Sequence, residues 1–257
     1  VQYHDFDIFG TQECFIHQLK DMKEALPGYD YIGVGRDDGK EKGEHSAIFY
    51  RTDKFDVIEK GDFWLSETPD VPSKGWDAVL PRICSWGHFK CKDTGFEFLF
   101  FNLHMDHIGK KARVESAFLV QDKMKELGKG KELPAILTGD FNVDQTHQSY
   151  DAFVSKGVLC DSYEKAGFRY AINGTFNDFD PNSFTESRID HIFVSPSFQV
   201  KRYGVLTDTY RSIVGKGEKK QANDCPEEID IKTYQARTPS DHFPVKVELE
   251  FDQRQQK

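Results

Sequence analysis

The run from Leu133 to Thr138 leads directly into Gly139-Asp140-Phe141-Asn142, and this joining of an apolar segment to a polar end most constrains the fold. A short apolar run of this kind is typical of a buried strand. Side chains two positions apart in an extended segment point the same way, so Asp140 and Asn142 aim at one spot. A carboxylate that accepts a proton or a metal, beside an amide that stabilises a developing negative charge, suits hydrolysis at phosphorus. The alternative is an Asx-rich turn after a strand.

Strands and helices are expected to alternate along the rest of the chain. We predict strands at 6–9, 47–50, 83–90, 97–103, 189–194 and 245–251, helices at about 110–127 and 150–156, and a helix carrying Phe15, Leu19, Met22 and Leu26. The polar stretch from Ser212 to Ile231 is predicted to be a surface loop. Because strands dominate, the simplest architecture is a two-layer β core with helices outside it.

Composition excludes several classes of protein. The 257 residues suit one large α/β domain or two small ones, with no apolar run long enough for a membrane-spanning helix. The net charge of −9 disfavours a large non-specific nucleic-acid surface, although bound cations would still permit chemistry on phosphates. Five scattered cysteines without a C-x-x-C pair argue against a zinc site or a disulfide framework. No compartment is predicted, because a chain that begins at Val1 leaves a removed targeting segment open.

Four further polar clusters lie beside predicted strands. They are Glu13, the stretch 102–107, the stretch 188–191 and the stretch 240–244. A carboxylate such as Glu13 suits a hard cation, although a glutamate in the first turn of a helix is also favoured by the helix dipole. Each cluster alone is more readily structural, and the five together favour an active site.

Five ordered motifs resemble the endonuclease/exonuclease/phosphatase superfamily over nearly the whole chain. They are Gln12-Glu13, Asn102-Leu103-His104, Gly139-Asp140-Phe141-Asn142, Arg188-Ile189-Asp190-His191 and Ser240-Asp241-His242. The segment from Phe63 to Pro69, with Trp76 and Arg82, resembles a bacterial subgroup of unassigned substrate. The resemblance implies an α/β four-layer sandwich of two stacked mixed sheets flanked by helices, with a divalent-metal site at one end of the sheets.

The resemblance also implies a role for each site residue. Glu13 matches the principal Mg²⁺ ligand, with Mn²⁺ as the alternative ion, and Asp241 matches a carboxylate at or near the metal. His242 matches the imidazole at the scissile phosphate, and Asp190 the carboxylate that orients it. Asp140 matches the group that activates water, and Asn142 matches the residue that stabilises the pentavalent oxygens. His104 matches a second histidine that contacts the phosphate, and Glu44, more loosely, matches the carboxylate that orients this second histidine.

The start of the chain departs from the family pattern. Members begin with a strand carrying an Asn metal ligand and then a helix, whereas here Val1 lies almost directly before the Gln12-Glu13 motif. We expect residues 1–257 to be a single domain that lacks this first strand and helix because the sequence is truncated, and we expect a monomer.

The sequence does not identify the substrate. Trp64, Trp76 and Arg82 fall in a Pro-rich connecting region that would form a substrate wall, with core packing as the alternative for the aromatic residues. Asn102 shares a face with His104 and is grouped with these substrate-binding candidates. The predicted function is Mg²⁺-dependent hydrolysis of a phosphate ester by direct attack of water, on a small molecule, a lipid or a nucleic acid. The net negative charge favours a small or lipid phosphate over a long nucleic acid. The competing hypothesis is an inactive binding module on the same fold.

Overall fold

The computed structural model describes residues 1–128, 133–170, 173–214, 226 and 233–251. Its helices are α1 (Ile16–Ala25), α2 (Lys110–Gly128), α3 (Gln148–Val154) and α4 (Ser162–Lys165). Its strands are β1 (Ile8–Gly10), β2 (Tyr29–Ile32), β3 (Ile48–Arg51), β4 (Phe55–Trp64), β5 (Ile83–Cys91), β6 (Glu97–His104), β7 (Ala135–Asp140), β8 (Cys160–Asp161), β9 (Phe168–Tyr170), β10 (Asp190–Val194), β11 (Phe198–Val205), β12 (Tyr210–Ile213), β13 (Tyr234–Arg237) and β14 (Val245–Phe251).

The largest sheet has six strands in the order β4-β5-β6-β7-β10-β8. Strands β6 and β7 run parallel, and the other neighbouring pairs are antiparallel. Helices α2 and α3 cover one face, where Phe101 and Leu137 pack with Val120 of α2 and Phe153 of α3. Alternation along each strand sends the intervening residues, such as Phe100 and Ile136, to the opposite face.

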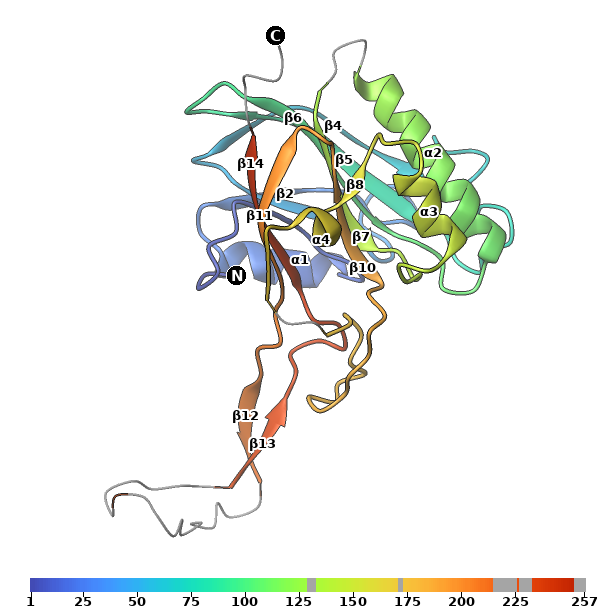
Figure 1. Ribbon diagram of the computed structural model, residues 1–257. Helices are drawn as coiled ribbons and strands as arrows, with labels where there is room; N and C mark the ends of the chain where they lie inside the picture. The colour runs from blue at the N-terminus through green and yellow to red at the C-terminus, as the bar shows by residue number, and fades with distance from the viewer. Residues whose placement is uncertain (129–132, 171–172, 215–225, 227–232, 252–257) are drawn as a thin grey trace.

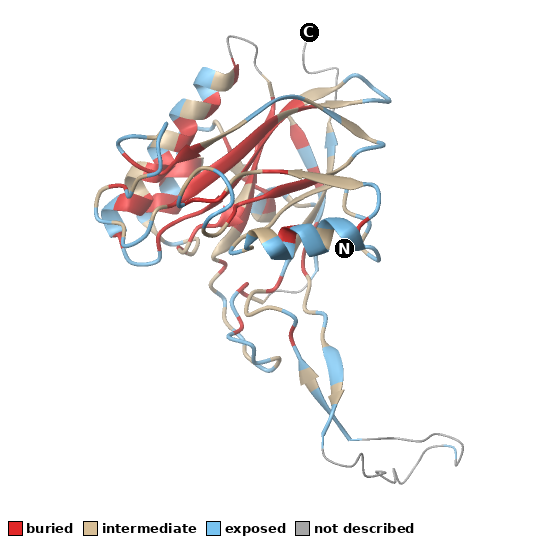
Figure 2. Ribbon diagram, turned by 180° about the vertical axis from the view of Figure 1, so that it is seen from behind, coloured by how far each residue is buried: buried red, intermediate tan, exposed pale blue. Residues whose placement is uncertain are grey.

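A second β layer covers that opposite face. It consists of two three-stranded sheets, β1-β3-β2 and β14-β11-β9, which share one hydrophobic core with the large sheet. Helix α1 packs outside the first of them, with Leu19 against Phe49. Figure 2 shows buried residues concentrated in the strands between the outer helices. The structure therefore has the expected order of layers, helix, sheet, sheet and helix.

Strands β12 and β13 form a separate two-stranded ribbon that projects from the body of the molecule (Figure 1). The predicted surface loop at 212–231 falls mostly outside the described residues, and its first two residues belong to β12. Among the described helices, none combines the length and the apolar character needed to cross a membrane.

Several strands were not predicted from the sequence, and one of them changes the reading of a candidate residue. Strands β2, β4 and β11 have no counterpart among the expected elements. The prediction that Trp64 lies in a connecting region is wrong, because Trp64 is the last residue of β4 and is only 5% exposed. The predicted helix at 110–127 and the strand pair at 83–90 and 97–103 are confirmed as α2, β5 and β6.

Candidate active site

Three neighbouring strands bring three candidate residues into one row. In the β6–β7 ladder His104 is paired with Asp140, and in the β7–β10 ladder Asp140 is paired with Asp190. Residues paired across adjacent strands project to the same face of a sheet. His104, Asp140 and Asp190 therefore stand side by side at the end of the large sheet, on the face that meets the second β layer.

His242 joins this row from the loop before β14. Its Nδ1 atom lies 2.8 Å from Oδ2 of Asp190, and the backbone N–H of Asp190 donates to the hydroxyl of Thr175 at 3.0 Å. Burial opposes a charge on the ring, but the hydrogen bond to Asp190 and the charges of Asp190, Asp140 and Asp241 outweigh it and raise the pKa of His242 to about 9. At neutral pH the ring is therefore an imidazolium.

Asp140 is a buried carboxylate that lies between His104 and Asp190 in this row. Burial, followed by the negative charge of Asp190, raises the pKa of Asp140 to about 7. Its Oδ2 atom lies 3.3 Å from Nε2 of His104, and its Oδ1 atom accepts a hydrogen bond from the backbone N–H of Asn142 at 2.8 Å. A carboxyl group with a pKa near neutrality is suited to take up a proton from water.

The expectation that Asp140 and Asn142 share one face of an extended segment is wrong. Strand β7 ends at Asp140, and Asn142 has φ of 51° and donates its backbone N–H to Oδ1 of Asp140, which is the alternative Asx turn. Asn tolerates this region better than most residues because its short polar side chain bonds locally. Its amide Nδ2 donates to the carbonyl of Met105 at 2.9 Å. One amide hydrogen is thus committed to holding the side chain, and the other is left for a ligand.

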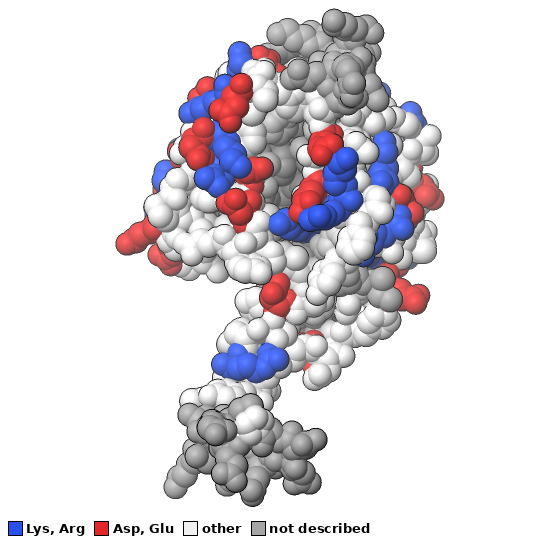
Figure 3. Space-filling model, turned by 60° about the vertical axis from the view of Figure 1, so that its left-hand side comes forward, with Lys and Arg blue, Asp and Glu red and all other residues white. Residues whose placement is uncertain are grey.

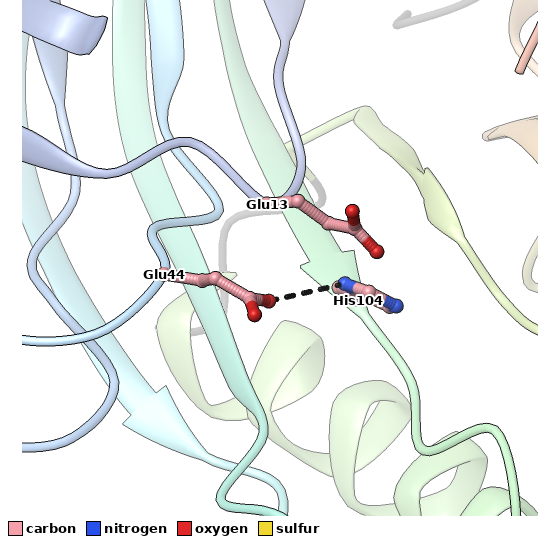
Figure 4. A group of neighbouring side chains, drawn as sticks. All are labelled: Glu13, Glu44 and His104. Carbon is pink, nitrogen blue, oxygen red and sulfur yellow. Dashed lines mark ion pairs between the residues drawn. The ribbon is translucent and has the colours of Figure 1, made fainter. Parts of the chain in front are cut away.

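Glu13, Glu44 and His104 form a second group, in which all three side chains point toward one another (Figure 4). Oε2 of Glu44 lies 3.9 Å from Nδ1 of His104, and Arg36 holds Glu44 through both of its terminal nitrogens, at 2.5 and 2.9 Å. Burial, with the charges of Arg82 and Arg36, keeps the pKa of His104 well below its ordinary value. His104 is therefore a neutral ring between Glu44 and Asp140.

The acidic side chains around Glu13 fit a hard divalent cation. Desolvation, then the charges of Glu44 and Asp241, raise the pKa of Glu13 above its ordinary value. Carboxylates gathered so that they repel one another are stabilised by a cation, and oxygen ligands are those that Mg²⁺ prefers. The ligand atoms of Glu13, Glu44 and His104 lie within 4.8 Å of one another, and the charge of Asp241 also acts on Glu13, so this group fits a divalent cation of the kind that the resemblance implies.

Arg82 is buried beside this acidic group, in a recess that Glu13, Arg36 and His104 also line. Its Nε donates to Asp106 at 3.4 Å and its Nη2 lies 2.9 Å from Nδ1 of His107. Among the described residues nothing bonds to its Nη1. Arg82 therefore brings a positive charge and an uncommitted donor to the candidate site.

Asn102, one of the four substrate-binding candidates, has a structural role instead. Asn102 is fully buried: its amide donates to the carbonyls of Thr11 and Ala47, and its oxygen accepts from Gln12 and Thr138. These bonds use the whole hydrogen-bonding capacity of an Asn side chain, so Asn102 anchors the Gln12-Glu13 segment and is not a substrate ligand.

The contacts of the two tryptophans are likewise those of structural residues. The indole of Trp64 donates to the carbonyl of Arg36 at 2.7 Å, so core packing explains it. Trp76 is half-buried with φ of 48°, and its backbone N–H donates to Glu67 at 3.0 Å. Neither tryptophan lines the recess beside Arg82.

The sequence missed two residues of this site. Arg36 holds Glu44, and the buried hydroxyl of Thr175 accepts the backbone N–H groups of both Ile189 and Asp190. Arg36 stands in a polar stretch where a buried arginine looks like any exposed one. The only available signal was its place in Gly35-Arg36-Asp37, just after a strand that was itself missed.

Comparisons with known proteins identify the family of this chain. The family model described as "Endonuclease/Exonuclease/phosphatase family" matches residues 1–242. A solved structure of a mannosyl-6-phosphatase from Bacteroides thetaiotaomicron VPI-5482 is 86% identical, covering 98% of this chain and 88% of that one, with a TM-score of 0.90. Another solved family member from Bacteroides thetaiotaomicron is 85% identical, covering 99% of this chain and 84% of that one, with a TM-score of 0.90.

A more distant relative extends the match to a virus. An uncharacterized protein of Acanthamoeba polyphaga mimivirus is 31% identical over 97% of this chain and 88% of its own length. The chain therefore belongs to the endonuclease/exonuclease/phosphatase family, and it is a hydrolase that acts on phosphoric ester bonds.

Proposed function

We propose that this protein is a Mg²⁺-dependent phosphatase that hydrolyses the phosphomonoester of mannose 6-phosphate. The observation that carries the chemistry is the pairing of His242 with Asp190 at 2.8 Å, beside Asp140 and facing an acidic group suited to a cation. The substrate class is supported by the 86% identity to a mannosyl-6-phosphatase over 98% of this chain.

Asp140 acts as the base in this proposal. Its raised pKa, about 7, lets it hold a proton taken from the attacking water, whereas an ordinary aspartate is too weak a base. His242 is too strongly protonated for that task at neutral pH, since its pKa is raised to about 9. Its imidazolium instead binds a phosphate oxygen and can protonate the sugar oxygen that leaves.

The other groups neutralise the negative charge that grows on the phosphate. His104 and the free hydrogen of Asn142 donate to its oxygens, and Arg82 supplies a full positive charge. Glu13 and Asp241, with Glu44 close by, would hold Mg²⁺, which when bound polarises the phosphoryl group. Aligned donors around a bound phosphate lower the barrier mainly by positioning and electrostatics.

The charges near the recess favour a phosphomonoester over a diester. A monoester carries up to two negative charges at neutral pH, because its second pKa is near 6. Arg36 and Arg82 both line the recess, and each retains a buried nitrogen without a partner in the described part of the chain. These two positive charges attract a doubly charged monoester more strongly than a singly charged diester.

Phosphate release from a panel of substrates tests the proposal. Mannose 6-phosphate, glucose 6-phosphate, a bis-aryl phosphodiester and a single-stranded oligonucleotide would each be assayed with Mg²⁺ and after chelation. The proposal expects mannose 6-phosphate to have the highest kcat/KM and chelation to abolish turnover. Preferred cleavage of the diester or the oligonucleotide would contradict it, and turnover unaffected by chelation would contradict the metal assignment.

A further inference from the structure

A hollow lies between the loop at 176–187 and the projecting strand β13, and the first residue of that loop, Phe176, packs against the ring of His242. The volume of the hollow is about 320 Å³. Its lining residues come from two segments and are Phe179, Asp180, Pro181, Asn182, Gln235, Ala236 and Arg237. Figure 1 shows that the ribbon of β12 and β13 extends away from the body on this side.

The hollow is joined directly to the catalytic loop. The carbonyl of Asp241 accepts the backbone N–H groups of Asn177 and Asp178 at 2.7 and 3.2 Å. The side chain of Asn177 in turn accepts from the hydroxyl of Thr238 at 3.2 Å, one residue beyond β13. Both walls of the hollow are therefore tied to the segment that carries Asp241 and His242.

Phe179 is displayed to solvent at a conformational cost. Its side chain is 61% exposed and its backbone has φ of 58°, a region that bulky residues rarely adopt. The conformation is held by its N–H, which donates to the side chain of Asn177 at 2.9 Å. Because the exposed ring gains little stabilisation from packing to offset the backbone strain, this conformation indicates a binding surface.

The polar groups around Phe179 suit a ring bearing hydroxyl groups. Asp180, Asn182 and Gln235 bring a carboxylate and two amides, and all three side chains are exposed. Oδ1 of Asp180 accepts from Asn182 and Oε1 of Gln235 accepts from Arg237, which leaves Oδ2 of Asp180 and the amide nitrogen of Gln235 for a ligand. Amides and carboxylates together can donate to and accept from neighbouring hydroxyls, while the flat face of an aromatic ring covers the C–H face of a sugar. This mixture is the chemistry of carbohydrate recognition.

The charges argue against a nucleic-acid strand in the same place. Arg237, the cation of the lining, already donates to Ser212 at 2.8 Å and to Gln235 at 3.2 Å, and Asp180 would repel a phosphodiester backbone. Single-stranded nucleic acids are normally tracked by a positively charged groove. Figure 3 shows Lys and Arg interspersed with Asp and Glu on the visible face of the body, without a continuous basic track.

We propose that this hollow is a glycosyl subsite, which holds a sugar unit linked to the phosphorylated mannose while the phosphate lies at His242. The proposal rests on the proposed function and deepens it, because it makes a phosphorylated oligosaccharide a better substrate than free mannose 6-phosphate. Phe179 stacks on the sugar and Gln235 bonds to its hydroxyls.

The test compares kcat/KM for free mannose 6-phosphate and for a mannose disaccharide phosphorylated at O6 of its non-reducing unit. The wild type is expected to prefer the disaccharide. Phe179→Ala is expected to lower the ratio of the two kcat/KM values about tenfold, or about 1.4 kcal/mol, and Gln235→Ala to lower it in the same direction. Phe168→Ala on β9 is the matched control, because that ring is also 61% exposed but does not line the hollow, and its ratio should stay at the wild-type value.

Each result separates the subsite from the proposed function. Equal kcat/KM for both sugars in the wild type, or an unchanged ratio in both variants, overturns the subsite and leaves the phosphatase intact. If neither sugar phosphate is hydrolysed, the proposed function fails, and saturation-transfer NMR with the unphosphorylated disaccharide decides the subsite: binding lost in Phe179→Ala supports it, and no binding to the wild type overturns it. Oligonucleotide turnover that depends on Phe179 overturns the carbohydrate assignment in favour of a nucleic-acid groove.

Discussion

Nδ1 of His242 and Oδ2 of Asp190 lie 2.8 Å apart, although the two residues are 52 positions apart in the chain. This contact fixes the orientation of the imidazole, and within the described residues it leaves Nε2 without a hydrogen-bond partner. The charge of Asp190 also raises the pKa values of both His242 and Asp140. The pH dependence of the enzyme should therefore follow this pair.

The first prediction concerns that pH dependence. Asp140 must be ionised to act as a base, so activity should fall as the pH drops below about 7, and His242 must be protonated, so activity should fall above about 9. Asp190→Asn removes the charge that raises both pKa values, and both limbs of the kcat/KM profile should move to lower pH, with kcat reduced about 100-fold or more. A profile in Asp190→Asn with both limbs unmoved would show that Asp190 does not control these groups.

The second prediction concerns the cation. Glu13→Gln keeps the shape of the side chain but removes the charge that we assign to metal binding, so affinity for Mn²⁺ or Mg²⁺ should fall at least about tenfold by calorimetry. Thermal unfolding without metal should occur at the same or a higher temperature, because Glu13→Gln removes a charge that Glu44 and Asp241 repel. Glu24→Gln, an exposed carboxylate on α1, is the control that should bind metal as the wild type does. Full turnover by Glu13→Gln at saturating Mg²⁺ would remove Glu13 from the metal site.

The third prediction concerns Asn102 as an anchor. Asn102→Ala removes hydrogen bonds to Gln12, Thr138 and two backbone carbonyls in a fully buried position, so the free energy of unfolding should fall by about 2–4 kcal/mol. Because the neighbouring Gln12-Glu13 segment loses its support, kcat should fall more than KM rises. Denaturant unfolding and steady-state kinetics measure the two effects. A rise in KM alone would instead restore Asn102 as a substrate ligand.

The fourth prediction concerns Arg82. Replacement by Ala should lower kcat/KM for a phosphomonoester about 10- to 100-fold, because a buried positive charge and an uncommitted donor are lost beside the phosphate. Arg82→Lys keeps the charge but not the planar arrangement of donors, so it should recover only part of the loss. The two variants are compared at matched folded fractions, since Arg82 also contacts Asp106. An unchanged substrate profile in Arg82→Ala would exclude Arg82 from substrate recognition.

The sequence predicted those parts of the fold where burial is continuous. Strands β6, β7 and β10 lie inside the large sheet, so both faces are apolar and their runs stand out, as does the apolar face of α2. Strand β4 lies at the edge of that sheet and carries exposed residues such as Glu59 and Lys60, which hid it among the loops. Trp64 was misassigned for the same reason.

The candidate site was predicted less directly than the strands that carry it. Polar residues at the ends of buried runs indicated Asp140 and His104, but the pairing of Asp190 with His242 came from the resemblance, because nothing local joins residues so far apart. Arg36 could not be found at all. Tertiary contacts bury Arg36: the indole of Trp64 donates to the carbonyl of Arg36, and Glu44 accepts hydrogen bonds from its guanidinium.

The most direct test of the central claim is the hydrolysis of mannose 6-phosphate by wild type and Asp140→Asn in the presence of Mg²⁺. Asp122→Asn, at an exposed carboxylate of α2, serves as the control for the substitution itself. We predict efficient release of phosphate by the wild type and the control, abolished by chelation, with kcat about 100-fold or more lower in Asp140→Asn. No release of phosphate by the wild type, or equal rates in Asp140→Asn, would contradict the account.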